Sequence, residues 1–181
     1  MDTTVTLRNL HPSDSIPELT RLLHAAYAEL AALGFNYTAT DQSDAVTQKR
    51  ISGGRCIVAA MGQAVVGTVL YKSPGLGSGS PHFARPDIAS LHQFAVAPAF
   101  QAQGIGAMLL DFVEAAARAD KATALALDTS EGASKLIAWY ARRGFQFVEF
   151  AQWTGKTYRS VILSKDLHAT AVDGHEAWDE S

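Results

Sequence analysis

The sequence feature that most constrains the fold of this chain is a glycine-rich turn. It lies between an apolar strand pattern and a strongly periodic helix pattern. Residues 101–106 read QAQGIG, after an apolar segment ending at Val96 and before a helix that begins near Ala107. A helix that starts in this way presents unpaired backbone N–H groups and the positive end of its dipole at one point. An anion can supply the missing acceptors. The sequence therefore predicts a phosphate-binding turn at this junction.

Strand and helix patterns alternate along the chain. Apolar residues at helical spacing, together with capping residues and glycine stops, predict helices over about 16–33, 41–51, 107–118 and 133–143. Short apolar or alternating runs bounded by turn residues predict strands over 4–8, 55–60, 64–71, 88–96, 123–128, 146–153 and 159–164.

The connections between these segments predict the topology of one domain. A short turn containing Gly62 makes a hairpin of the second and third strands. The strand, helix and strand over 88–128 imply a right-handed parallel crossover, and the last two strands an antiparallel pair. The Gly, Ser and Pro-rich segment 72–87 is expected to be a long exposed loop, either lining a site or merely connecting elements. We expect a single domain over 1–164 and a polar tail over 165–181.

Composition narrows the class of partner. The 181 residues carry a net charge of −3 and a pI near 6.0, which argues against nucleic acid or an anionic membrane surface as partner. Cys56 is the single cysteine, so no internal disulfide can form. No apolar run reaches the roughly 18 residues of a membrane span, and the first residues lack a signal-peptide pattern. We expect a cytoplasmic protein.

Two general phosphate-binding motifs do not fit the turn. A dinucleotide-binding fingerprint needs a third glycine where this chain has Leu109, and it follows the first strand of its domain. A Walker A loop needs Lys and then Ser or Thr after the last glycine, but Ala107 and Met108 follow Gly106.

A third pattern fits. The run LHQFAVAPAFQAQGIGAMLL over 91–110 resembles motif A of the GNAT superfamily of N-acetyltransferases, where a strand is followed by Q/R-x-x-G-x-G/A and a long helix. About 30 residues later, Tyr140 precedes Gly144 and Phe145 in the Tyr-x-x-x-Gly-Phe pattern that resembles the family's next helix. The resemblance implies an α/β (α+β) fold: a mixed, mostly antiparallel sheet of six to seven strands, with a splayed parallel central pair and about four flanking helices.

The resemblance implies acetyl-CoA as cosubstrate in the cleft between the splayed strands. There, strand backbone without a neighbour can bind the pantetheine amides like an added strand. By family position, backbone groups of Phe94, Ala95 and Val96 would contact the pantetheine and acetyl groups. The pyrophosphate would lie against Gln101, Ala102, Gln103, Gly104, Ile105, Gly106 and Ala107.

One corner of the expected cofactor site departs from the family pattern. Ala133 stands where many members have an Asn that contacts CoA. Ser134 could replace that donor, or could simply be a surface residue at the helix start.

The chemistry implied is direct transfer of an acetyl group from the thioester to an amine. At pH 7 an alkylamine with a pKa near 10 is about 99.9% protonated, so a base or a water chain is required. The Val96 N–H is the expected donor to the tetrahedral oxyanion. Tyr140 occupies the family's usual general-acid position and would protonate the departing thiolate.

The base has three candidates. His92 lies where the similar strand of serotonin N-acetyltransferase carries a relay histidine, although Ser90 replaces its companion. Asp128 matches the place of a glutamate base in bacterial ribosomal-protein N-acetyltransferases, and it could instead cap the next loop. Ordered water alone is the third.

Several points stay open at the level of sequence. A non-catalytic acyl-CoA sensor and an interaction module with the same fold are alternatives to an enzyme. The amine acceptor, small molecule or peptide, cannot be identified, and a homodimer through the final strands is open. Trp139, Trp153, Tyr158 and Phe83 could wall the acceptor pocket or fill the core. The remaining histidines show no metal-ligand spacing, so no metal is expected.

Overall fold

A computed structural model describes residues 4–168. The first described strand begins at Val5, and the last one ends at Asp166, directly before the buried Leu167. Most of the expected polar tail, from residue 169 on, lies outside the described residues.

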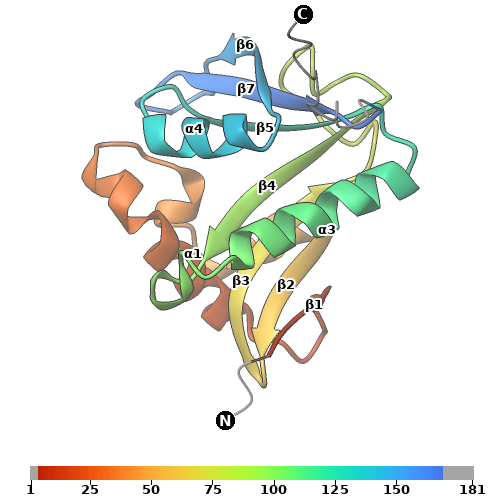
Figure 1. Ribbon diagram of the computed structural model, residues 1–181. Helices are drawn as coiled ribbons and strands as arrows, with labels where there is room; N and C mark the ends of the chain where they lie inside the picture. The colour runs from red at the N-terminus through yellow and green to blue at the C-terminus, as the bar shows by residue number, and fades with distance from the viewer. Residues whose placement is uncertain (1–3, 169–181) are drawn as a thin grey trace, which may run out of the picture.

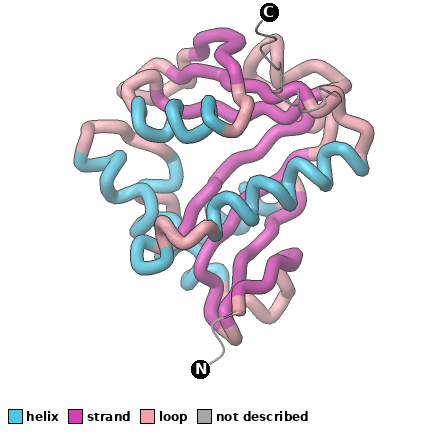
Figure 2. The backbone as a smooth tube through the Cα atoms, viewed as in Figure 1, coloured by secondary structure: helices cyan, strands magenta, loops and turns pink. Residues whose placement is uncertain are grey.

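Seven strands form one mixed sheet (Figures 1 and 2). Their order across the sheet is β1-β2-β3-β4-β5-β7-β6, and every neighbouring pair is antiparallel except β4 and β5, which are parallel. The strands are β1 (Val5–Asn9), β2 (Arg55–Met61), β3 (Ala64–Lys72), β4 (Ile88–Val96), β5 (Ala124–Ser130), β6 (Gln146–Ala151) and β7 (Ser160–Asp166). The expected hairpin, crossover and final antiparallel pair are confirmed.

Four α-helices cover the sheet. They are α1 (Ile16–Ala32), α2 (Asp44–Ile51), α3 (Ile105–Ala119) and α4 (Ser134–Arg142). Ser15 and Ser43 cap α1 and α2 by accepting hydrogen bonds from the backbone N–H groups of Glu18 and Val46. The second predicted helix began too early, because residues Thr38–Thr40 form a separate 3-10 turn before the Ser43 cap.

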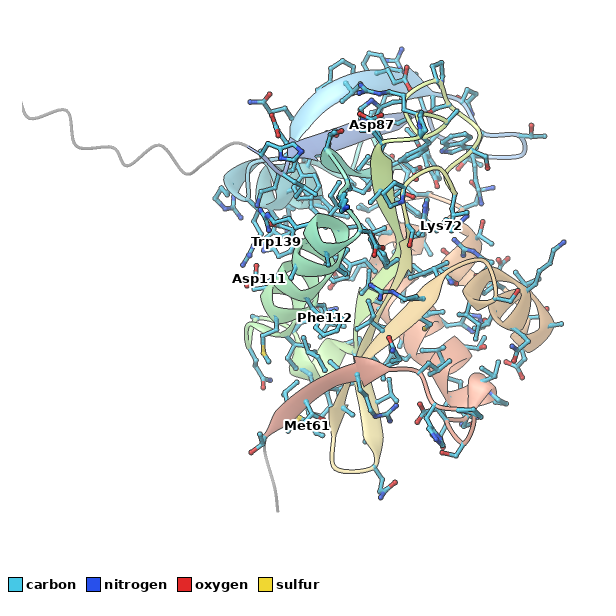
Figure 3. All side chains as sticks on the ribbon, turned by 90° about the vertical axis from the view of Figure 1, so that its right-hand side faces the viewer. Met61, Lys72, Asp87, Asp111, Phe112 and Trp139 are labelled. Carbon is cyan, nitrogen blue, oxygen red and sulfur yellow. The ribbon has the colours of Figure 1, made fainter. Side chains whose placement is uncertain are left out.

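Alternation along the strands divides the core into two faces. Ile57 packs with Leu109 and Val113 of α3, whereas its neighbour Val58 packs with Leu19 of α1. The α3 side continues to α4, while α1 and α2 cover the opposite side (Figure 1). On α3, Asp111 and Phe112 lie on the outward side (Figure 3), where Phe112 is still 37% exposed. The sheet therefore has helices on both faces and places β4 at its centre.

The parallel pair separates after three residues. β4 and β5 pair from Ile88 with Ala124 to Ser90 with Ala126, and no further. Beyond this point β4 carries an irregularity in its pairing with β3, where Gln93 has a left-handed φ of 48°. The bulge turns β4 away from β5 and leaves the side of β4 that faces β5 without a partner strand. The predicted splay is therefore present.

Candidate functional site

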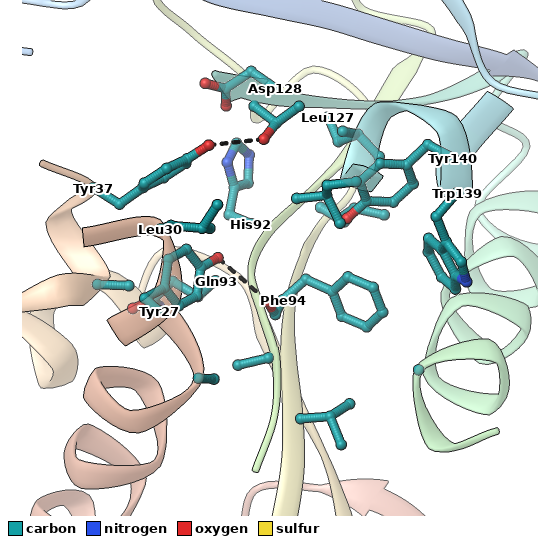
Figure 4. Close-up of a pocket in the computed structure, with 18 of the residues that line it drawn as sticks. Tyr27, Leu30, Tyr37, His92, Gln93, Phe94, Leu127, Asp128, Trp139 and Tyr140 are labelled. Carbon is teal, nitrogen blue, oxygen red and sulfur yellow. Dashed lines mark hydrogen bonds between the residues drawn. The ribbon is translucent and has the colours of Figure 1, made fainter. Parts of the chain in front are cut away.

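A cavity of about 800 Å³ occupies the gap between the splayed strands (Figure 4). Its walls come from α1, the Thr38–Thr40 turn, α2, the loop between β3 and β4, β4, the glycine-rich turn, β5, α4 and the connection between β6 and β7. The first compartment lies against the start of α3 and is lined there by Gly104, Gly106 and Ala107. The second, or acceptor, compartment lies between α1 and the β6–β7 connection and is lined there by Tyr27, Trp153 and Lys156. The fold thus places two adjoining compartments on one strand.

The β4 backbone presents the N–H of Val96 to the first compartment. Val96 stands opposite Gly67, and the N–H of Ala97 donates to the carbonyl of Val66 over 2.9 Å. This pattern makes Val96 and Gly67 a non-hydrogen-bonded pair, so the Val96 N–H points away from β3. It faces the gap that β5 has left. A ligand amide or oxyanion can therefore reach it.

The glycine-rich turn forms the end of this compartment. Ala102 and Gly104 have left-handed φ values of 59° and 83°, and Gly104 is the N-cap of α3. Within residues 4–168, no acceptor receives a hydrogen bond from the backbone N–H groups of residues 102–107. These donors therefore lie unpaired at the positive end of the helix dipole, as the sequence pattern of the turn predicts.

The predicted cofactor residues do not all lie at the cavity. Phe94, Ala95 and Val96 line it, as do Gln101, Ala102, Gly104, Gly106 and Ala107. The side chain of Gln103 is exposed, and Ile105 is 2% exposed in the core, so these two residues could offer only backbone groups. Ser134 is exposed at the first turn of α4 and is not among the cavity-lining residues.

Tyr140 lies at the junction of the two compartments (Figure 4). Its ring packs against Phe94, Trp139 and Phe145, with centroid distances of 6.4, 5.1 and 5.5 Å. The side chain is 3% exposed, and no described residue hydrogen-bonds to its hydroxyl. Burial raises the pKa of this phenol well above its usual value. Tyr140 therefore presents a protonated hydroxyl to the cavity over the whole physiological range.

His92 lies on β4 in the second compartment (Figure 4). Its Nε2 is 2.9 Å from the hydroxyl of the buried Ser90. Burial, followed by the charges of Lys72 and Arg50, lowers the pKa of His92 to about 3. The imidazole is therefore neutral near pH 7 and a weak proton acceptor.

Asp128 lies on β5, facing the same compartment. Its Oδ2 accepts hydrogen bonds from the Trp153 indole N–H over 2.8 Å and from the Ser160 hydroxyl over 3.0 Å. Both donors are uncharged, and within the part of the chain described no cation pairs with this carboxylate. The structure thus places both candidate bases at one compartment together with Tyr140.

Aromatic and cationic side chains complete the second compartment. Trp153, Tyr158 and Phe83 line it, whereas Trp139 lines the compartment next to the turn. Sequence reasoning missed four residues there: Tyr27, Tyr37, Arg50 and Lys156. Tyr27 falls within the apolar pattern of α1, which indicates only packing. Arg50 is a basic residue in the last turn of a helix, a place where a solvated charge is ordinary.

Two further properties concern the described residues. Residues 4–168 contain no group of three or more His, Cys, Asp or Glu arranged to hold a metal ion. No helix in this range is long and apolar enough to cross a membrane.

A model of the acetyltransferase (GNAT) family matches residues 19–145. The chain belongs to this family. The match begins within α1, includes α2, α3, α4 and the crossover, and ends at Phe145, the last residue of the Tyr140 motif. GNAT acetyltransferases use acetyl-CoA as acetyl donor, so this chain is an acetyl-CoA-dependent acetyltransferase by family and fold. A comparison with curated protein sequences gives no significant match.

Solved structures share the fold of this GNAT chain. A GNAT family acetyltransferase from Elizabethkingia anophelis with acetyl-CoA bound is 19% identical, with a TM-score of 0.64 over 91% of this chain and 99% of that one. The ribosomal-protein-S18-alanine N-acetyltransferase of Escherichia coli is 16% identical, with a TM-score of 0.67 over 95% and 99%. At these identities the likeness concerns the fold.

Proposed function

We propose that this chain transfers the acetyl group directly from acetyl-CoA to the nitrogen of an amine acceptor, in a ternary complex within the splayed cleft. The observation that carries the proposal is the continuity of the cavity. One space is lined by the Val96 N–H, the unpaired N–H groups at the start of α3, the Tyr140 hydroxyl and a polar second compartment. Donor and acceptor can therefore meet without a covalent enzyme intermediate.

The donor half of the cavity suits an extended pantetheine arm. The β4 edge offers the Val96 N–H, whereas the carbonyls of Phe94 and Val96 accept hydrogen bonds from the Tyr27 hydroxyl over 3.2 Å and from the Gln101 Nε2 over 3.0 Å, which a pantetheine amide would share or replace. The pyrophosphate would lie on the N–H groups of residues 102–107. Gly106 lets phosphate oxygens approach the backbone closely. Arg143, beside the same compartment, stacks on Trp139 with its guanidinium carbon 5.0 Å from the ring centroid. Its charge would add to the attraction for phosphate.

Two groups stabilise the charges that develop during transfer. The outward-facing Val96 N–H would donate to the oxyanion of the tetrahedral intermediate, a contact that can be worth about 3 kcal/mol. The Tyr140 hydroxyl would donate its proton to the thiolate of CoA as the C–S bond breaks. Its lack of a protein partner leaves it available for this role.

We assign Asp128 as the group that receives the amine. Its carboxylate has uncharged donors on one side and the cavity on the other, so it can bind the ammonium form and accept its proton, directly or through water. His92, with a pKa of about 3, would bind the acceptor as a neutral hydrogen-bonding group.

Ligand stabilisation and thiol release test this function in sequence. Acetyl-CoA at 100 times its Kd should stabilise the fold by about 2.7 kcal/mol, seen as a higher Tm. An amine panel should then release CoA thiol at rates that depend on the amine. An unchanged Tm at millimolar acetyl-CoA would count against any CoA-dependent function. A raised Tm without amine-dependent thiol release would indicate a sensor.

A further inference from the structure

Arg50 places a positive charge in the acceptor compartment without an acidic partner. It lies in the last turn of α2, and its Nη1 donates to the Gln42 Oε1 over 2.7 Å. Within the described range no carboxylate lies within ion-pair distance of its guanidinium. A guanidinium carries five N–H donors, so most of them have no protein acceptor. Partial burial of such a cation costs folding free energy unless a ligand accepts its remaining hydrogen bonds.

The position of Arg50 is fixed by buried neighbours. Gln42 is 4% exposed, and its Nε2 donates to Thr47 over 2.7 Å and to Gln93 over 2.9 Å. Gln93 is the residue at the β4 bulge. Through Gln42, hydrogen bonds therefore connect the guanidinium to the β4 bulge that opens the cavity, and they restrict its movement.

A second cation lies on the same compartment. Lys156, in the β6–β7 connection, donates to the Asn36 carbonyl over 2.8 Å and to the Thr38 hydroxyl over 2.9 Å. Both acceptors are uncharged. Burial and then the charge of Arg50 lower the pKa of Lys156, more than Asp41 and Asp128 raise it, so the two cations repel each other across the compartment. An anion in the compartment would relieve that repulsion.

The charges of this compartment are therefore complementary to a zwitterion. Within residues 4–168, Arg50 and Lys156 supply two positive charges with no carboxylate at ion-pair distance. Asp128, whose charge acts on both cations from further away, supplies a negative charge with no cation at that distance. We infer that the acceptor is an amine that also carries a carboxylate, such as an amino acid. This inference rests on the proposed N-acetyltransferase function. Arg50 binds the carboxylate, and Asp128 receives the amine. Phe83, Trp153 and Tyr158 provide an apolar wall for its side chain.

The test compares acceptors that differ only in the carboxylate. Suitable pairs are L-phenylalanine with phenethylamine, L-leucine with isoamylamine and L-tyrosine with tyramine. Values of kcat/KM are calculated for the neutral amine, which removes differences in amine pKa. We expect the amino acid to be the better member of at least one pair. Arg50→Gln should then lower its kcat/KM about 10- to 100-fold, mostly through KM, and change that of the matched amine less than about threefold.

Lys49→Gln is the matched control, because this substitution also removes one positive charge, from an exposed position on the same helix. It should leave the ratio of the two acceptors unchanged. Equal losses for both acceptors in Arg50→Gln would reduce Arg50 to a structural residue and overturn the inference. Acetylation of the bare amines without acetylation of the amino acids would also overturn the inference, but it would leave the proposed N-acetyltransferase function intact. An unchanged Tm with acetyl-CoA would instead defeat the proposed function itself.

Discussion

Tyr140→Phe isolates the proposed general acid from the packing of the same side chain. The aromatic contacts with Phe94, Trp139 and Phe145 would remain, and no described residue loses a hydrogen bond when the hydroxyl is removed. We therefore expect the free energy of unfolding to change by less than about 0.5 kcal/mol. Removal of a general acid typically costs at least about 100-fold in rate, or about 2.7 kcal/mol of transition-state stabilisation. The variant should lose that much kcat at near-constant stability.

The assay is thiol release under saturating acetyl-CoA and the best amine, with urea unfolding in parallel. Tyr140→Ala is the contrasting variant, since a lost ring should cost about 3 to 5 kcal/mol of stability as well. The raised pKa of Tyr140 also predicts that wild-type kcat shows no decline up to about pH 10 from loss of the phenol proton. A Tyr140→Phe variant as fast as the wild type across this range would refute the general-acid role.

Three further outcomes follow from the site. Gly104→Ala should lower both stability and acetyl-CoA affinity measured by calorimetry, because Gly104 has a left-handed φ of 83° at the N-cap of α3; unchanged affinity would contradict a role of this turn in phosphate binding. The folded-state pKa of His92 is below its unfolded value near 6.5, so the unfolded chain takes up a proton first as pH falls. Between pH 7 and 5 the wild type should therefore lose about 2 kcal/mol more unfolding free energy than His92→Gln. Parallel pH dependence in urea unfolding would show that His92 is not buried neutral. Asp128→Asn should lower kcat at least about 100-fold and His92→Gln much less; the reverse order would transfer the base role to His92.

The sequence predicts the geometry of the glycine-rich turn well, because local chemistry defines it. A glycine turn before a periodic helix requires unpaired N–H groups whatever surrounds it, and the spacing to Tyr140 identifies the family. The sheet order follows from the same segments, since hairpins and a crossover allow few arrangements.

The acceptor half depends on contacts between distant segments. Arg50 and Lys156 are 106 positions apart (156 minus 50), and each has an ordinary surface pattern in its own segment. Only the fold shows that Gln42 and the Gln93 bulge hold Arg50 at the cavity. In the same way, the low pKa of His92 arises from burial and from charges on other elements, which strand periodicity does not reveal.

A structure of this chain with CoA bound tests the central claim most directly. The account predicts pantetheine along Phe94 to Val96, the pyrophosphate on the N–H groups of residues 102–107, and the thiol within hydrogen-bonding distance of the Tyr140 hydroxyl. CoA bound outside the splayed cleft, or a thiol remote from Tyr140, would contradict it.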